Sequence, residues 1–287
     1  MIPPDANAPI TSGPPRPGFS PRALVPFYVA RFKIEIATSF AYRGAMLIWL
    51  LSLIVQPLVS LVVWTTVADS QGGAAGGYTA SDYAAYFIAV MVVNQLTFMW
   101  HMWEMEWRVR TGFYSPILLR PLHPIHEDIV GNLSFKLLTL VPLVPVAVIL
   151  SIVFDAHYPT TVRDAIAFVP ALILAIGLRY MVEWTFGLLA FWMTKVTAFY
   201  QLFGSLSFFL AGQIAPLSLF PKPIQTLASV LPFRWTLSFP VEVALGRVDG
   251  RGIAAGLGMQ VLWLAIAIVI MRLVWSRATK RYSAVGA

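Results

Sequence analysis

The chain has 287 residues, of which 58% are hydrophobic and 11% are charged, with a formal net charge of +7. A soluble globular domain carries about 25% charged residues, so this composition excludes an ordinary soluble protein. Several apolar runs reach the roughly 20 helical residues needed to cross a bilayer, and the sequence therefore predicts an all-α polytopic membrane protein. The chain contains no cysteine, which excludes disulfides and thiolate-bound metals.

The N-terminal region divides into two segments. Residues 1–20 are rich in proline and small residues and lack an apolar run, so we expect a flexible cytoplasmic tail. In residues 21–43, apolar side chains recur every four positions, at Leu24, Tyr28, Phe32, Ile36 and Phe40. Arg31 and Lys33 lie off this stripe. The pattern predicts an amphipathic helix in the inner interface, with its apolar face toward lipid and its charges toward water and lipid phosphates. Such a helix could also serve only as an anchor.

Six apolar segments predict six transmembrane helices. They lie at residues 44–68, 83–103, 129–154, 165–193, 198–220 and 252–275. Together they form a predicted transmembrane domain at 44–275, followed by a cytoplasmic C-terminal tail at 276–287. An even number of spans places both termini on one side of the membrane. Most of the 20 Lys and Arg residues fall in segments on that side, which predicts that both termini are cytoplasmic.

The segment between the fifth and sixth spans is apolar but contains many prolines. Residues 211–251 include Pro216, Pro221, Pro223, Pro232 and Pro240. Prolines interrupt a continuous helix, and irregular backbone at membrane depth needs protein or water to satisfy its polar groups. We therefore expect short broken helices that dip into the outer leaflet and pack against neighbouring spans.

Two ionisable residues, Arg179 and Glu183, lie one helical turn apart near the middle of the fourth predicted span. A charge at that depth costs about 2.5–3.5 kcal/mol on insertion scales, so both should face other helices. They could belong to a translocation path or a subunit seam, or form a static ion pair. Asn94, Gln95 and Gln213 are further candidates for the same path or seam, although such residues more often join helices by hydrogen bonds.

The sequence offers no catalytic or metal-binding pattern. His123, His126, Glu127 and Asp128 cluster in one proline-rich loop, but they match no closed ligand set. The G-x-S-x-G, H-E-x-x-H and G-x-x-x-x-G-K-[ST] motifs are missing. We therefore expect no catalytic residue, no metal and no cofactor bound by this chain; if it uses ATP, another subunit supplies the site.

The polar segment after the second predicted span carries a recognisable order of residues. It runs "EMEWRVRTGFYSPILLRPLHP" from Glu104 to Pro124. It resembles the cytoplasmic loop of type-2 permeases of ABC exporters, in which charged residues precede a glycine, a Leu-Leu pair and a Pro-Leu. The matching positions are Glu106, Arg108, Arg110, Gly112, Leu118, Leu119, Arg120, Pro121 and Leu122. The proline-punctuated segment at 211–251 is also similar to the late segment of that family.

The resemblance implies a role for this loop and a set of partners. The matched loop residues from Glu106 to Pro121, together with Arg31 and Lys33 of the N-terminal helix, would couple the chain to ATPase subunits. Two ABC ATPase subunits would bind ATP and Mg²⁺, and a second permease, identical or related, would complete the pore. The loop could instead be a solvated linker.

The implied function is export of a hydrophobic or amphiphilic compound across the bacterial cytoplasmic (inner) membrane. Drug-like xenobiotics, lipids and lipid-linked glycans all fit; membrane lipid is an expected partner and nucleic acid is not. Two alternatives remain open from the residues alone. One is a membrane-embedded lipid-modifying enzyme, and the other is an ion-coupled secondary transporter that uses Arg179 and Glu183.

Overall fold

The computed structural model describes residues 24–41, 43–193 and 195–282. The predicted tail at 1–20 lies outside these residues, as do residues 283–287 of the predicted tail at 276–287; residues 276–281 of that tail are helical. The elements before the fourth predicted span are α1 (Leu24–Ala41), α2 (Arg43–Ser70), β1 (Ala74–Ala75), β2 (Tyr78–Thr79), α3 (Ala80–Thr97), α4 (His101–Arg110), α5 (Ser115–Leu118) and α6 (Ile125–Val153). The later elements are α7 (Val162–Gly187), η2 (Leu188–Phe191), α8 (Thr197–Leu210), η3 (Leu217–Leu219), α9 (Lys222–Val230), α10 (Phe233–Thr236), α11 (Ser238–Ala244) and α12 (Gly250–Arg281).

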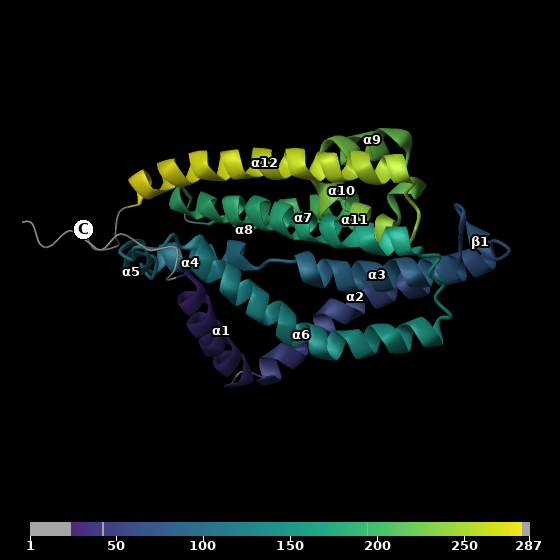
Figure 1. Cartoon of the computed structure of the whole chain (residues 1–287), viewed down its shortest axis with the longest axis horizontal. Coiled ribbons are helices and arrows are strands. Elements are labelled where there is room, and N and C mark those ends of the chain that lie inside the picture. The colour runs from purple at the N-terminus through teal and green to yellow at the C-terminus, as the bar shows by residue number, and fades with distance from the viewer. Residues whose placement is uncertain (1–23, 42, 194, 283–287) are drawn as a thin grey trace, which may run out of the picture.

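Long helices lie roughly side by side around α3 (Figure 1). Helix α12 packs along α7, α2 packs along α3, and α6 contacts both α1 and α3. Most side chains of α3 are buried, including Tyr83, Tyr86 and Phe87. The α4–α5 region, α1 and the C-terminal end of α12 lie at one end of the bundle, and the β1–β2 hairpin lies at the other. The two ends of the described chain therefore lie at the same end of the bundle.

Within the described part of the chain, four helical stretches are long and apolar enough to cross a membrane. They are Ala80–Arg110, Ile125–Val153, Val162–Phe191 and Gly250–Arg281. These stretches match the second, third, fourth and sixth predicted spans. The first predicted span falls on α2, of which Ile54–Ser70 counts as a shorter apolar helix. The six-span count stays a prediction.

The predicted fifth span, 198–220, is longer than the helix that forms there. Helix α8 has 14 residues and ends at Leu210. Gly212 follows with φ +79°, where a Cβ would lie 2.7 Å from the Tyr86 hydroxyl oxygen. A left-handed residue in such close contact stops the helix. At 1.5 Å per residue, α8 spans about 21 Å, which is shorter than the apolar core of a bilayer.

Short broken helices follow α8, as the prolines predict. Side chains from other helices form hydrogen bonds with the irregular backbone just after α8 and hold it in place. Tyr86 Oη donates to Gly212 O at 2.8 Å, and Trp64 Nε1 donates to Ile214 O at 2.8 Å. Gln260 Nε2 of α12 similarly donates to Trp235 O at 2.8 Å. Irregular backbone in a membrane requires such hydrogen bonds from the protein to satisfy its polar groups.

Helix α1 lies within the segment 21–43 that was predicted as an interfacial helix, but its contacts differ from the predicted orientation. Half-buried Tyr28 and Arg31 both contact α6: the Tyr28 hydroxyl lies 2.9 Å from His126 Nδ1, and Arg31 Nη2 lies 3.1 Å from Glu127 Oε1. Val25, Val29 and Ile34, which lie off the predicted stripe, are exposed instead. Leu24, Tyr28, Phe32 and Ile36 of the apolar stripe are half-buried, and the contact of Tyr28 with His126 holds this side of α1 against α6.

Candidate functional site

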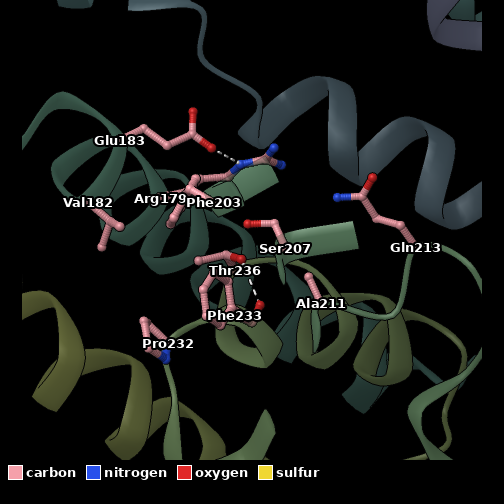
Figure 2. Close-up of a pocket in the computed structure, with 10 residues that line it drawn as sticks. All are labelled: Arg179, Val182, Glu183, Phe203, Ser207, Ala211, Gln213, Pro232, Phe233 and Thr236. Carbon is pink, nitrogen blue, oxygen red and sulfur yellow. Dashed lines mark hydrogen bonds and ion pairs between the residues drawn. The ribbon is translucent and has the colours of Figure 1, made fainter. Parts of the chain in front are cut away.

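An ion pair lies within the membrane-spanning part of the bundle (Figure 2). Arg179 Nε donates to Glu183 Oε1 at 2.6 Å, one turn later on α7. The Arg179 Nη1 group also reaches α3, where it donates to Asn94 Oδ1 at 2.7 Å and to Thr97 Oγ1 at 3.0 Å. Arg179 and Glu183 are 9% and 2% exposed. Four polar groups on two helices therefore satisfy most of each other's hydrogen-bonding capacity, as buried charges require.

The position of this ion pair explains a break in the second predicted span. Helix α3 ends at Thr97, and α4 begins at His101. Asn94 and Thr97, which hold Arg179, belong to the last turn before the break. Asn132 Nδ2 of α6 donates to the freed carbonyl of Phe98 at 3.3 Å. Polar side chains from α6 and α7 thus stabilise the α3–α4 junction.

The pocket beside the ion pair is nearly closed. It has a volume of about 10 Å³ and is lined by Arg179, Glu183, Phe203, Gln213 and Phe233, among others. A water molecule needs about that much room, so no cargo molecule fits in this conformation. The predicted path residues Arg179, Glu183 and Gln213 therefore line one closed constriction, and Asn94 is joined to it through Arg179.

Gln95 is the exception among the predicted path residues. It is buried, and its Nε2 donates to Thr139 Oγ1 of α6. Gln95 therefore joins α3 to α6 and takes no part in the contacts around Arg179.

The segment from α4 to the start of α6 forms a compact elbow, residues 101–128, at the same end of the bundle as the described termini (Figure 1). Gly112 ends α4 with φ +77°, a left-handed conformation that favours glycine. Tyr114 N then donates to Arg108 O at 3.0 Å, which closes the turn. The Ser115 and Tyr282 hydroxyls lie 2.7 Å apart, so the elbow also contacts the end of α12.

A buried carboxylate, Asp128, anchors the elbow. Arg108 Nη1 donates to Asp128 Oδ1 at 2.7 Å, and Trp184 Nε1 of α7 donates to Oδ2 at 2.9 Å. Arg108 Nη2 also donates to Glu104 Oε1 at 2.6 Å. The Asp128 side chain is fully buried. This one carboxylate therefore joins α4, α6 and α7.

Sequence reasoning missed the role of Asp128. It considered Asp128 only as one of four possible metal ligands, and it placed Arg108 among the residues that would couple the chain to ATPase subunits. Arg108 points inward, because the buried Asp128 carboxylate would otherwise lack a counter-charge. The one local signal was an acid in the first turn of a helix, a position that the helix dipole favours.

The remaining predicted coupling residues divide into two groups. Arg110, Leu119, Arg120 and Pro121 are exposed, and so is Lys33 on α1. Leu118 packs against the core, and Glu106 accepts a hydrogen bond from Val196 N at 3.1 Å, just before α8. Only the first group can meet a partner directly. The second group connects the elbow to the rest of the protein.

The exposed side of the elbow carries large apolar side chains. The rings of Trp107 and Phe113 stack with their centroids 4.9 Å apart, and Phe113 and Leu119 are 58% and 74% exposed. Arg120 Nη1 lies beside them and pairs with Glu127 Oε2 at 2.6 Å. Glu127 in turn pairs with Arg31 of α1. An apolar knob with a charged rim, tied to α1, has the composition of a protein interface.

The loop histidines have structural contacts. The His123 ring lies 4.5 Å from that of Trp275, and its Nδ1 accepts from Ile125 N at 3.2 Å. Burial lowers the pKa of His123, the nearby His126 lowers it further, and Asp128 opposes the shift. Within the residues that the structure describes, no group of three or more His, Asp or Glu side chains is arranged to hold a metal ion.

Comparison with known proteins gives one match. No curated protein and no solved structure matches the chain. The family model described as "ABC-2 family transporter protein" matches residues 53–286, which covers α3 to α12, most of α2 and both sites described above. The chain therefore belongs to the ABC-2 transporter family, whose members are membrane components of ABC transporters.

Proposed function

We propose that this chain is the permease subunit of an ATP-driven exporter. It moves a hydrophobic or amphiphilic compound out of the cytoplasm or the inner leaflet, while separate subunits hydrolyse ATP. Two permeases and two ABC ATPase subunits form the complex, which lies in the bacterial inner membrane with both termini of this chain in the cytoplasm. Family membership supports the permease role, and the excess of Lys and Arg in the inner segments supports the orientation.

The observation that carries this proposal is the two-sided construction of the elbow. Its outer side presents Phe113, Leu119 and Arg120 to solvent. Its inner side is fixed through Asp128 to α6 and α7. A force on the outer side would therefore move the ends of three helices together, which a solvated linker could not do.

This connection leads to the closed constriction. Arg108 and Asp128 hold α4 to α6, and Arg179 holds α7 to the last turn of α3. Closure of the ATPase subunits would tilt these helices and change the contacts around Arg179 and Glu183. ATP thus supplies the differential binding energy that shifts the protein between an inward-open and an outward-open state.

Co-purification tests the proposal. Phe113→Asp and Leu119→Asp each place a charge on the exposed knob and should reduce co-purification of the ABC ATPase severalfold, since interface centres exclude unpaired charges. Leu227→Asp is the matched control, because Leu227 is 49% exposed on α9, away from the elbow. Full recovery of the ATPase with both elbow variants would overturn the proposal.

The alternatives predict different results from the same preparation. A lipid-modifying enzyme would convert its substrate as an isolated chain. An ion-coupled transporter would work without ATP, stop when the ion gradient collapses, and lose activity in Glu183→Gln. The small volume around Arg179 and the pairing of its guanidinium with Glu183 favour neither alternative.

A further inference from the structure

A second cavity lies between α6 and α7, with α3 behind it. Its volume is about 300 Å³, at the lower end of the range for small-ligand pockets. Apolar side chains form most of the wall, among them Leu96, Leu140 and Ile176. Leu133 and Leu137 of α6 also line it and are about half exposed, so the cavity opens at the surface of the bundle.

A lysine, Lys136, lines this apolar cavity. The residue is only 5% exposed. Among the described residues, neither a hydrogen bond nor an ion pair reaches its ammonium group. The other polar side chains of the wall already have partners: Asn132 donates to Phe98 O, and Tyr180 donates to Ile125 O. Lys136 is therefore a buried donor without a counter-charge in contact with it.

The neighbouring charged residues do not neutralise the positive charge of Lys136. Arg179 and Glu183 lie within electrostatic range of Lys136, but they pair with each other. The three groups together carry one more cation than anion. An uncompensated charge inside a bilayer costs several kcal/mol and commonly marks a binding site.

We propose that this cavity binds a single-chain amphiphile with an acidic head group. The carboxylate pairs with the Lys136 ammonium, and the alkyl chain lies against Leu133, Leu137, Leu140 and Ile176. The volume suits one chain better than the two chains of a phospholipid. Lys136 is about 16 Å along α6 from its first residue, and its side chain leans back toward that end of the helix. The acid therefore enters from the end of the bundle where the elbow lies. This inference depends on the cavity and not on an ATPase partner.

Binding of a matched pair of ligands tests this site. The purified chain, in phosphatidylcholine nanodiscs with any native partners, is titrated with dodecanoate and with dodecanol, which has the same chain without the charge. We expect dodecanoate to bind about tenfold or more tightly, because a charge-assisted hydrogen bond is lost with the alcohol. Equal affinities would overturn the proposal.

Variants locate the binding. Lys136→Met should remove the preference for dodecanoate, and Lys136→Arg should retain it. Arg272→Met removes an exposed cation from α12 and should leave the preference unchanged. In phosphatidylcholine nanodiscs, Lys136→Met should also have a higher melting temperature than the wild type. Added dodecanoate should reduce this difference between the two melting temperatures. A preference that survives Lys136→Met would contradict the site.

Two further outcomes would assign the cavity to another occupant. If phosphatidylglycerol nanodiscs stabilise the protein and dodecanoate does not, the occupant is a phospholipid and not a single-chain amphiphile. Disulfide cross-linking between two copies of a Leu137→Cys variant, with no effect of dodecanoate, would show that a second permease covers the cavity.

Discussion

Arg108 and Asp128 lie 20 residues apart, and their side chains meet at 2.7 Å inside the elbow. The pair joins the end of α4 to the first turn of α6, and Trp184 extends it to α7. Helix α7 also carries Arg179 and Glu183, which line the constriction. In the proposed mechanism, coupling between the elbow and the constriction depends on this buried pair.

Asp128→Asn should destabilise the protein strongly. The substitution leaves the Arg108 guanidinium buried beside a neutral amide, and breaking a buried pair costs about 3–5 kcal/mol. Thermal melting of the purified complex measures the loss. Glu104→Gln is the control, because Glu104 is one-third exposed and its pair with Arg108 should contribute only about 1 kcal/mol or less. Similar losses for both variants would show that Asp128 is not the anchor.

Arg179 and Glu183 should behave as a coupled pair. Arg179→Met or Glu183→Met alone leaves one buried charge without its partner and should cost about 3–5 kcal/mol. The double variant removes both charges and should cost less than the sum of the two single changes. A double-mutant cycle of melting temperatures measures this coupling. Additive losses would mean that the two residues act independently.

Gly112 should tolerate asparagine better than alanine. Its φ of +77° costs an alanine about 1–2 kcal/mol, whereas asparagine adopts this conformation more readily. No atom lies within 4 Å of the added Cβ, so the backbone alone decides the effect. Melting temperature and ATPase stimulation should fall in the order wild type, Gly112→Asn, Gly112→Ala. The reverse order of the two variants would refute this reason for the glycine.

His123 should make stability depend on pH. Burial lowers its pKa in the folded protein, whereas the unfolded value is about 6.5. Below about pH 6.5 the unfolded chain binds more protons than the folded one. The stability that neutral His123 contributes is therefore present above that pH and is lost as the pH falls through the lowered value.

Melting curves at about pH 7.5 and 5.5 measure this dependence. The loss on acidification should be smaller in His123→Gln than in wild type, because glutamine does not titrate. His157→Gln removes an exposed histidine from the opposite end of the bundle and should not change the loss. An unchanged loss in His123→Gln would exclude this histidine as the cause.

The sequence allowed prediction of the parts that depend on local pattern. Apolar runs predicted four of the long helices. The T-x-x-D patterns at Thr79 and Thr161 could also have been read from the sequence, since they form the capping boxes that begin α3 and α7. The spacing of Arg179 and Glu183 was enough to suggest their ion pair, which forms at 2.6 Å. These features depend on residues within one or two helical turns of each other.

Features that depend on tertiary contacts were not predictable. The break after Thr97 has no proline or glycine nearby, and it is held by Asn132 and Arg179 from other helices. The inward turn of Arg108 depends on Asp128, which lies beyond a loop. The early end of α8 had a local signal in Gly212, but apolar residues on both sides of it suggested a longer span.

Cross-linking at the elbow tests the central claim most directly. The chain contains no cysteine, so Leu119→Cys introduces a unique reactive site on the exposed knob, and Leu227→Cys introduces one on α9. In native membranes the cysteine at 119 should cross-link to an ABC ATPase, with a yield that changes on addition of ATP and Mg²⁺, whereas the cysteine at 227 should not. Failure to cross-link from 119, or the same yield from both positions, would contradict the account.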